Sequence, residues 1–494
     1  MTTPLPVPLR RLLAGVSDAR VRGNPDVIVS SISVDSREVE RGGLFACLRG
    51  TRDDGHARAG DAVARGATAV LAARDVETGG APLVVVSDVL AALSPIAAEF
   101  FAHPSRSLIC VGVTGTNGKT TTTHFFEAIA AAAGKAFGLI GTLGARLADR
   151  FSVDLAHTTP YAHDLQALLA RFLDAGADGA VLEVSSHALT MHRVDDVAFD
   201  VAALTNVTHD HLDFHGTFEE YAASKRRLFE LAREQTVKPP GVCVLNLDDP
   251  EGRRMAAALP ALTYGLNSGD AALRATDIES FAGGTRFRVQ SLRSEPFVIR
   301  LPGPFNVANA MAAIACARSL GIDAGAIGDG LLSVAGVPGR MTHVPAERVS
   351  VYVDYAHTPD GLRNVLSAAR SLTEKRVICV FGCGGDRDSL KRPEMGRIAR
   401  ELADHIVVTS DNPRFEDPMR IINQVLAGIE GEGTSYDVIL DRREAIEHAI
   451  AQANSGDVII IAGKGHEAYQ LIRGEHLPFS DVGAAEAAIR KVGA

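Results

Sequence analysis

The sequence predicts an α/β protein with three domains. Its 494 residues suit about three domains, since a domain typically has about 100–200 residues. From residue 108 onward, short apolar runs alternate with helical patterns, which is typical of parallel sheets covered by helices. A loop rich in glycine and threonine lies between one such run and a helix. We therefore expect an N-terminal α/β domain over 1–102, a central P-loop domain with a parallel sheet over 103–338, and a Rossmann-like, doubly wound domain over 339–494.

Composition and charge argue against several classes of function. The formal net charge is −10, and the largest basic clusters are as short as Lys225–Arg227, whereas a nucleic-acid-binding protein needs a basic face. We therefore expect small-molecule substrates and no nucleic acid. No apolar run reaches the roughly 18 residues of a membrane span, and Arg10 and Arg11 interrupt the apolar N-terminus, so we expect neither a span nor a signal peptide. The six cysteines form no Cys-x-x-Cys pair, which favours buried, reduced thiols in a cytoplasmic protein.

The elements of the first two domains follow from short apolar runs. Ala69–Leu71 and Leu83–Val86 predict strands, and Phe100–Ser107, which contains a proline, predicts a linker to the second domain. Leu108–Val113 predicts the first strand of the central sheet, followed after the glycine-rich loop by a helix over about 120–133. Two further apolar runs predict neighbouring strands of a parallel sheet: Ala180–Val184 and Val201–Leu204.

Strands and amphipathic helices alternate most regularly in the third domain, and this alternation predicts a doubly wound sheet. The carboxyl ends of the strands in such a sheet face the ligand crevice, so the loops after the strands are where a ligand site is expected. The predicted strands are Val349–Val353, Val377–Phe381, Ile406–Thr409, Val438–Leu440 and Val458–Ile461.

The loop Gly115–Thr120 joins the first central strand to its helix. Glycines let backbone amides approach an anion closely, and the helix N-terminus adds partial positive charge. Lys119 would reach the β- and γ-phosphates, and the Thr120 hydroxyl would hold Mg²⁺. Val113 stands where the strict Walker spacing has glycine, so the loop is a variant, but the strand before it and the helix after it are the required context. The sequence therefore predicts a phosphate-binding loop.

Acidic and histidine side chains follow two further strands of the central sheet. Glu183 lies in the run Ala180–Val184, and His211 follows the run Val201–Leu204. Because the carboxyl ends of these strands face the ligand crevice, we expect both groups and Thr120 to converge on metal and phosphate. A carboxylate, an imidazole and a hydroxyl would form part of a Mg²⁺ shell. A lone histidine is more often a solvated loop residue, and the shared edge with the phosphate loop favours the ligand role here.

In their order along the chain, these motifs resemble the Mur ligase family of peptidoglycan synthesis. The resemblance implies that the first domain binds the UDP of UDP-N-acetylmuramoyl-L-alanyl-D-glutamate, the second ATP, and the third an amino acid. It implies an ATP-dependent amide ligase that forms an acyl phosphate and releases ADP and phosphate, with two Mg²⁺ ions. We expect a monomer. The motifs that carry the resemblance are Asp35–Arg37, Gly115–Thr120, Glu183–His187, Asn206–His211, Ser224–Lys225, Gly303–Asn306, Gly339–Met341, Asp354–Asp360, Phe381–Arg387, Asp411–Arg414 and Gly463–Glu467.

The resemblance also implies roles for single residues. The pattern alone predicts an exposed Lys225 on a helix over 219–234, whereas the resemblance implies a carbamylated N6-carboxylysine there that supports the second Mg²⁺. The implied catalytic and metal-binding positions are Lys119, Thr120, Glu183, His211 and Lys225. The implied ATP-binding positions are Gly115, Thr116, Asn117, Gly118, Lys119, Thr120, Thr121, Asn306, Arg340, Asp354 and His357.

Positions in the first two domains match those that hold the UDP-sugar peptide. They are Val34, Ser36, Thr51, Arg52, Asp53, His157, Thr158, Thr159, Ser185, Met191 and Arg193. The chain departs from the family's pattern at Met191, where glutamine is expected, at His157, where asparagine is common, and at Thr342, where glutamate is usual.

Loops of the third domain carry the charged residues that are expected to determine the specificity for the amino acid. Meso-diaminopimelate has two carboxylates and two amines, whereas L-lysine lacks the distal carboxylate. Arg414 can clamp that carboxylate bidentately, Glu467 can pair with the distal ammonium, and Arg387 offers a second cationic donor. The family's diaminopimelate-adding members carry the same Asp-Asn-Pro-Arg motif. The residues expected around this ligand are Arg387, Asp411, Asn412, Pro413, Arg414, Gly463 and Glu467.

Particular residues distinguish the alternative functions. A P-loop switch or remodelling NTPase would carry a basic nucleic-acid patch or a hydrolysis-linked switch segment, whereas the third domain carries a crevice for a small ligand. Among related amide ligases, Asp35–Arg37 favours a muramoyl substrate over the folate of a folylpolyglutamate synthase, and Arg414 disfavours a lysine-adding synthetase. A module that only binds would not need Lys119, Thr120 and Glu183 together.

Overall fold

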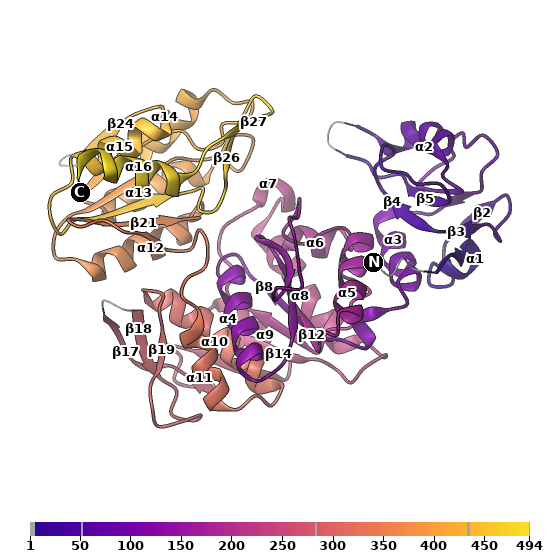
Figure 1. The fold of residues 1–494 in the computed structure, drawn as a ribbon, viewed down its shortest axis with the longest axis horizontal. Coiled ribbons are helices and arrows are strands. Elements are labelled where there is room, and N and C mark those ends of the chain that lie inside the picture. The colour runs from indigo at the N-terminus through magenta and orange to yellow at the C-terminus, as the bar shows by residue number, and fades with distance from the viewer. Residues whose placement is uncertain (1–4, 51–52, 282–283, 432–434, 494) are drawn as a thin grey trace. The chain divides into compact units, whose positions relative to one another are not determined.

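The computed structural model (Figure 1) describes residues 5–50, 53–281, 284–431 and 435–493. The described residues form two compact units. The first unit lies within 1–114, 134–203 and 224–243, and the second within 115–133, 204–223 and 244–494. The predicted domain boundaries, at 102/103 and 338/339, stay predictions. All six cysteines lie among the described residues and are buried, as predicted.

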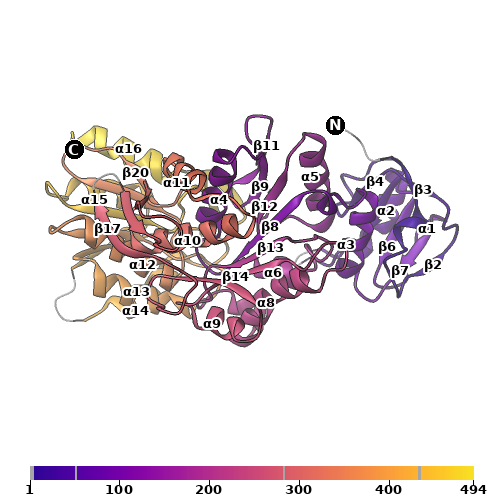
Figure 2. The same ribbon diagram turned by 90° about the horizontal axis from the view of Figure 1, so that it is seen from below.

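The N-terminal part of the first unit is a sheet with apolar layers on both faces. Its strands follow the order β2-β7-β6-β5-β4, with β4 to β7 parallel and β2 antiparallel to β7. Figure 2 labels β2, β4, β6 and β7 of this sheet. Because side chains alternate along a strand, Leu44 packs on the same side as α1 and α3, and Phe45 on the side of α2. The elements are β1 (Val7–Pro8), α1 (Leu9–Leu12), β2 (Arg20–Arg22), β3 (Ile28–Val29), β4 (Ser31–Ser33), β5 (Gly43–Ala46), η1 (Gly55–Arg58), α2 (Ala59–Arg65), β6 (Ala69–Ala72), β7 (Leu83–Val85), α3 (Val89–Phe100) and η2 (Pro104–Arg106).

The segment predicted as a linker, Phe100–Ser107, is a packed turn. Helix α3 continues to Phe100, and η2 follows four residues later. Pro104 and Ser105 are buried, and Ser105 Oγ accepts a hydrogen bond from the Ala198 backbone amide at 3.1 Å. Its role as a linker between two domains stays a prediction, but the segment is partly helical and partly buried. A proline marks a break in the helix and does not determine whether the broken segment is exposed.

A second set of paired strands in the first unit carries Glu183. Strands β8, β12 and β9 are parallel neighbours, and Glu183 of β12 lies opposite Val113 of β8. Strands β10 and β11 add antiparallel neighbours beyond β9. The prediction of a wholly parallel sheet was therefore wrong at this edge. The elements are β8 (Ile109–Thr114), β9 (Phe137–Gly141), β10 (Gly144–Leu147), β11 (Phe151–Val153), α5 (Ala162–Asp174), β12 (Gly179–Glu183), α6 (Ser186–Thr190) and β13 (Val201–Leu204).

The second unit contains the helix that follows the glycine-rich loop, α4, which packs against α10 and α11. An antiparallel sheet, β17-β18-β19, was not predicted. Its strands mix exposed and buried positions without a clean alternation, so the sequence gives little signal. Helix α8 (Phe218–Glu234) and strand β14 (Val242–Asn246) belong partly to the first unit, which includes 224–243, and partly to the second. The other elements are α4 (Lys119–Ala132), α7 (Leu212–His215), α9 (Pro250–Ala256), β15 (Ala261–Gly265), β16 (Leu273–Arg274), β17 (Thr276–Phe281), β18 (Gly284–Arg288), β19 (Phe297–Ile299), α10 (Pro304–Ser319) and α11 (Ala324–Ser333).

The C-terminal part of the second unit is doubly wound, as predicted. The strand order is β20-β21-β25-β22-β23-β24, and every pairing except β20 with β21 is parallel. Apolar side chains of α12, α13 and α14 form one core layer with the sheet, and those of α15 and α16 form the other. The elements are β20 (Thr342–Val344), β21 (Ser350–Asp354), α12 (Pro359–Leu372), β22 (Val377–Phe381), α13 (Lys391–Leu402), β23 (His405–Val408), α14 (Pro418–Ile429), β24 (Tyr436–Val438), α15 (Arg442–Ala451), β25 (Val458–Ala462), β26 (Tyr469–Ile472), β27 (Glu475–Pro478) and α16 (Asp481–Val492).

Candidate active site

The glycine-rich loop has the backbone conformation that its sequence predicts. Gly115 and Gly118 have positive φ angles of 148° and 88°, which L side chains rarely adopt. A Cβ on Gly118 would also collide with Asn309 Oδ1. The Asn117 amide donates to Asn206 Oδ1 at 2.9 Å, and Lys119 Nζ donates to the carbonyls of Gly115 and Thr116 at 2.7 and 2.9 Å. The ammonium of Lys119 therefore lies over the loop, at the N-terminus of α4.

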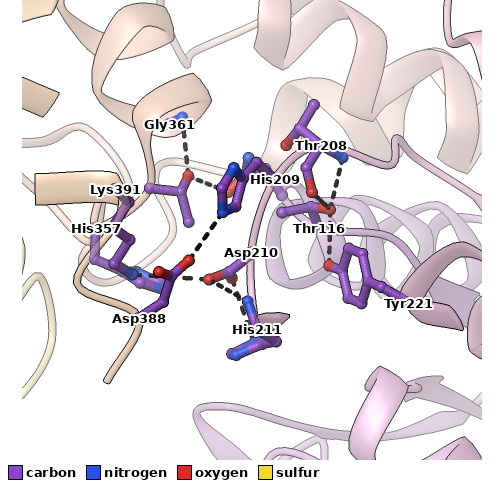
Figure 3. A network of polar contacts seen from close by, with 12 residues as sticks. Thr116, Thr208, His209, Asp210, His211, Tyr221, His357, Gly361, Asp388 and Lys391 are labelled. Atoms are coloured by element: carbon purple, nitrogen blue, oxygen red, sulfur yellow. Dashed lines mark hydrogen bonds and ion pairs between the residues drawn. The ribbon is translucent and has the colours of Figure 1, made fainter. Parts of the chain in front are cut away.

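Thr116 binds a neighbouring segment of the protein through its side chain. Thr116 Oγ1 lies 2.8 Å from the Tyr221 hydroxyl, donates to the Thr208 carbonyl at 3.1 Å and accepts from the Thr208 amide at 3.0 Å (Figure 3). Burial raises the pKa of Tyr221 well above its usual range, so its hydroxyl stays protonated. These contacts fix the loop against the segment that leads to His211. Sequence reasoning missed Tyr221, because a helical tyrosine alone gives no signal of its partner.

Arg340 reaches the residue that begins the phosphate-binding helix. Its Nη2 donates to Thr120 Oγ1 at 3.0 Å, and its guanidinium carbon lies 4.7 Å from the centre of the Tyr355 ring. Asn117 Nδ2 donates to Asp360 Oδ2 at 2.9 Å. Of the residues predicted to hold ATP, Thr120 and Arg340 therefore contact each other, and Asn117 contacts Asp360, all within the second unit.

Other predicted nucleotide residues make contacts within the protein. Asp354 accepts from the Met341 and Ala356 amides at 2.7 and 2.8 Å, and burial raises the pKa of Asp354 to about 6. His357 Nδ1 donates to the Tyr355 carbonyl at 2.8 Å, and burial lowers the pKa of His357 to about 4. His357 is therefore neutral at pH 7. Asn306 and Thr121 are also buried.

Charged residues from the third predicted domain meet the segment around His211. His209 Nε2 lies 2.9 Å from Asp388 Oδ2, and Lys391 Nζ lies 3.7 Å from Asp210 Oδ1 (Figure 3). Burial opposes ionisation of Asp210, but the charges of His211 and Lys391 outweigh it and hold the pKa of Asp210 well below its usual range. Sequence reasoning missed Asp210, Asp388 and Lys391, because the pairs that they form join positions about 180 residues apart.

His211 itself has a strained backbone. Its φ is 55°, a region that residues with a Cβ occupy at a cost. Its Nε2 lies 3.3 Å from Asp210 Oδ2, and its side chain is 40% exposed. His211 is thus held beside an ionised carboxylate and stays accessible, which suits the predicted ligand role.

Glu183 lies at the carboxyl end of β12 in the first unit and is fully buried. Its two carboxylate oxygens accept from the Thr142 amide at 2.9 Å and the Thr142 hydroxyl at 3.0 Å. A Cβ on Gly141 would collide with the same carboxylate. Thr142 was not predicted, although it directly follows an apolar strand, a position that carries site residues in such sheets.

Several residues predicted to hold the UDP-sugar peptide cluster next to Glu183. Thr159 Oγ1 donates to the Glu183 carbonyl at 2.8 Å and accepts from the Ser185 amide at 3.1 Å. Arg193 Nη1 donates to the Thr159 carbonyl at 2.7 Å, and its Nη2 lies 3.4 Å from Met191 Sδ. Met191, one of the departures from the family's pattern, therefore packs against Arg193.

Two more predicted residues lie close by. Thr158 Oγ1 is 3.1 Å from the Thr142 hydroxyl, and the His157 ring packs edge-on against Tyr161, with the ring centres 5.5 Å apart. Burial lowers the pKa of His157, which favours a neutral imidazole. Thr342, another departure, accepts from the Gly339 amide at 2.9 Å in the second unit, so its hydroxyl holds the Gly-Arg-Met loop.

The described residues of the N-terminal region that are predicted to hold the UDP-sugar peptide lie outside the strands of its sheet. Thr51 and Arg52 lie outside the described residues. Asp35 Oδ2 accepts from Arg37 Nη2 at 2.6 Å, and this hydrogen bond lowers the pKa of Asp35 to about 2. The loop after β4 is thereby closed by its own charge pair. The described UDP candidates are half-buried or exposed: Val34, Ser36 and Asp53.

Lys225 is 2% exposed on helix α8. The interpretation of Lys225 as a solvated surface residue was therefore wrong, because the helix turns this face inward. A buried ammonium is costly unless it is compensated. The implied joint site of Thr120, Glu183, His211 and Lys225 draws on both units and stays a prediction.

The loops predicted to bind the amino acid lie close together in the second unit. Arg414 Nη1 donates to the Gly385 carbonyl at 2.7 Å and would collide with a Cβ on Gly384, so this glycine makes room for the guanidinium. Burial and the nearby Arg387 charge lower the pKa of Arg414, but a guanidinium stays charged at pH 7. Arg414 has a φ of 54°, and its amide donates to the Leu471 carbonyl at 2.9 Å.

Glu467 is fixed by two donors within this loop cluster. Lys464 Nζ donates to Glu467 Oε2 at 2.7 Å, and Asn412 Nδ2 donates to the same oxygen at 2.8 Å. Gly463 has a φ of 122°, and a Cβ there would collide with Asp411 Oδ2. The structure thus brings Asp411, Asn412, Gly463 and Glu467 together, with Pro413 buried between them and Arg414. Lys464, which is fully buried, was missed.

Comparison with known proteins identifies the family. Residues 28–101 match the Mur ligase family, catalytic domain; residues 113–317 match the Mur ligase middle domain; and residues 339–465 match the Mur ligase, glutamate ligase domain. The chain belongs to the Mur ligase family. A relative from Syntrophomonas wolfei, named UDP-N-acetylmuramoyl-L-alanyl-D-glutamate--2,6-diaminopimelate ligase, is 45% identical over 465 residues, which cover 93% of this Mur ligase and 94% of the relative. A relative of the same name from Geobacillus thermodenitrificans is 43% identical over 474 residues, covering 95% and 96%.

Solved structures agree with this assignment. A structure of UDP-N-acetylmuramoyl-L-alanyl-D-glutamate--2,6-diaminopimelate ligase is 34% identical to this Mur ligase, covers 99% of it and 100% of that chain, and superposes with a TM-score of 0.67. The MurF ligase of Thermotoga maritima, solved in complex with ADP, shares the fold at 20% identity, with 94% and 97% coverage and a TM-score of 0.67.

The predicted family, the α/β fold class and the ligase activity are therefore confirmed for this Mur ligase. Use of ATP is consistent with the family and with its phosphate loop. Within the described ranges, the helices are too short or too polar to span a bilayer.

Proposed function

We propose that this Mur ligase joins meso-2,6-diaminopimelate to the D-glutamate of UDP-N-acetylmuramoyl-L-alanyl-D-glutamate, using ATP and acting as a monomer in cytoplasmic synthesis of peptidoglycan precursors. Relatives that match over nearly the full length carry this activity in their names. The observation that carries the proposal is the loop cluster in which the side chains of Arg387 and Arg414 both lie near Gly384, while Lys464 holds Glu467 in place.

The charges of this cluster match the two ends of the proposed amino acid. The guanidinium groups of Arg387 and Arg414 repel each other, and a bound carboxylate relieves that repulsion. Glu467 would pair with an ammonium of the ligand. L-Lysine would leave Arg414 without its carboxylate in a half-buried site, which penalises lysine binding.

The chemistry requires positioning and charge more than a nucleophile on the protein. The glutamate carboxylate attacks the γ-phosphorus of ATP, and ADP leaves. The amine then attacks the carbonyl carbon of the acyl phosphate, and phosphate leaves as the amide forms. Negative charge shifts among phosphoryl oxygens in both steps, and Lys119, already held over the loop, would stabilise it.

The side chains also fit the proposed Mg²⁺ ions. Glu183 offers a fully buried carboxylate and Thr120 a hydroxyl, which are the oxygen donors that Mg²⁺ prefers. Carbamylated Lys225 would add a second carboxylate, and His211 an imidazole. Bound Mg²⁺ supplies positive charge beside the phosphoryl oxygens.

The family resemblance is the support for the proposed carbamylation of Lys225, and this step is testable by itself. Replacement of Lys225 by glutamine should lower kcat on the order of 10²–10³-fold, because the residue then lacks a negative charge. Replacement by glutamate should retain more activity than glutamine. Bicarbonate should stimulate the enzyme that carries the native Lys225 but not the variant Lys225→Glu. Equal activity of the two variants, or no carbamate signal in carbon NMR with ¹³C-bicarbonate, would refute the modification.

The whole function is tested by phosphate release from ATP with UDP-N-acetylmuramoyl-L-alanyl-D-glutamate and Mg²⁺. We expect release with meso-diaminopimelate and little with L-lysine. Release with lysine alone would keep the ligase and overturn the role given to Arg414. Release with neither, by an enzyme that still binds ATP, would overturn the proposed substrates.

A further inference from the structure

We propose that His405, Asp437 and His448 form a binding site for a zinc-class divalent cation, separate from the reaction site. His405 begins β23, Asp437 lies in β24, and His448 lies on α15. One ligand atom of each residue lies within 4.8 Å of the other two. None of the motifs that carry the family resemblance includes these residues, which we name the histidine–aspartate cluster.

Both imidazoles converge on one carboxylate oxygen. Asp437 Oδ2 lies 3.0 Å from His405 Nε2 and 2.7 Å from His448 Nε2. In a tetrahedral zinc site, metal–ligand distances of about 2.1 Å place neighbouring ligand atoms about 3.4 Å apart. Each nitrogen–oxygen pair would therefore open by less than about 1 Å to admit the ion. Small side-chain rotations supply that movement.

The Ser435 hydroxyl can form a hydrogen bond with His405 whether or not an ion is bound to the cluster. His405 Nδ1 lies 2.7 Å from Ser435 Oγ. Without an ion, Nε2–H donates to Asp437 and Nδ1 accepts from the hydroxyl, which can donate or accept. With an ion on Nε2, the proton lies on Nδ1 and is donated to Ser435. Metal-binding histidines are commonly oriented by such a partner on the second ring nitrogen.

The donor set indicates which ion fits. Two imidazoles with one carboxylate suit Zn²⁺ and its neighbours among the transition metals, whereas Mg²⁺ prefers oxygen ligands and retains water. The side chains of Asp437 and His448 are 41% and 42% exposed, while that of His405 is 9% exposed. Solvent therefore reaches the cluster from the side of His448, and a water molecule can complete the tetrahedron.

The position of the cluster indicates a structural role. His405 lies at the amino end of β23, whereas Asp411 and Arg414 follow the carboxyl end of the same strand. Strand β24 ends the strand order of its sheet and pairs with β23. A bound ion would tie this edge strand to β23 and to α15 without contact with the amino-acid loops.

Titration of the full-length, metal-free chain with ZnCl₂ in excess Mg²⁺ tests the proposal. We expect the unmodified protein to bind one more zinc equivalent than His448→Ala or Asp437→Asn, and to gain a few degrees in Tm that both variants lack. Because His448 is exposed, its replacement should leave the fold intact. His476→Ala, which changes an exposed histidine on β27, is the matched control and should bind like the unmodified protein.

Cobalt provides a direct view of the ligands. In His448→Cys, Co²⁺ should produce a thiolate-to-metal charge-transfer band that neither the unmodified protein nor His448→Ala shows, because the six native cysteines are buried. Ser435→Ala should weaken Zn²⁺ binding by about tenfold or more. Equal zinc stoichiometry in the unmodified protein and His448→Ala, or absence of the cobalt band in His448→Cys, would overturn the site. Either result would leave the ligase proposal untouched.

Discussion

Replacement of Lys119 by alanine is expected to lower kcat/KM by about 10³-fold, the scale at which single preorganised charges act on phosphoryl transfer. Lys119 begins α4, and its ammonium donates to the Gly115 and Thr116 carbonyls at 2.7 and 2.9 Å. The charge is thus already held over the phosphate loop before ATP binds. Since negative charge spreads over phosphoryl oxygens in the transition state, most of the loss should appear in kcat rather than KM.

Steady-state kinetics of phosphate release, together with calorimetric binding of ADP, measure this effect. Lys119→Arg keeps a cation but changes its shape and donor geometry, so it should recover only part of the activity. Lys135→Ala removes a partly exposed lysine just beyond the other end of α4 and serves as the matched control, with unchanged kinetics. A loss confined to KM would show that Lys119 binds ATP without stabilising the transition state, contrary to the role assigned here.

Local conformation was predictable wherever a short segment determines its own backbone geometry. The positive φ angles of Gly115 and Gly118 follow from the tight turn between a strand and a helix, and the loop has that form. The doubly wound sheet was equally predictable, because buried parallel strands such as Val377–Phe381 are apolar throughout and alternate with amphipathic helices. Strand ends were displaced by one or two residues, as for Val438–Leu440, where the strand is Tyr436–Val438.

Features that depend on distant partners were not predictable. A lysine among charged residues on an amphipathic helix gives no sign that its face is buried, so the pattern alone placed Lys225 in solvent. The ion pair between Lys391 and Asp210 joins elements that no periodicity relates. Only the resemblance, which carries information about the assembled fold, pointed to the role of Lys225. Buried polar contacts between separate motifs are therefore the part of the site that the structure adds.

Replacement of Arg414 by alanine is expected to abolish the preference for meso-diaminopimelate over L-lysine. The kcat/KM for diaminopimelate should fall by about 10³-fold or more, while the low value for lysine should stay the same or rise. The physical reason is that Arg414 Nη1 is fixed on the Gly385 carbonyl at 2.7 Å, in a space that Gly384 leaves open. A guanidinium held in this way can bind a carboxylate bidentately, and alanine can bind none.

The comparison that decides this prediction is the ratio of kcat/KM values for the two amino acids. Arg414→Lys keeps one positive charge without the planar fork, so its ratio should lie between those of the unmodified enzyme and Arg414→Ala. Arg420→Ala removes an exposed arginine of α14 as the matched control, and its ratio should not change. If Arg414→Ala lowers activity with both amino acids equally, Arg414 stabilises the loop and does not bind the distal carboxylate of diaminopimelate. Arg387, whose side chain also lies near Gly384, would then be the residue that distinguishes the two substrates.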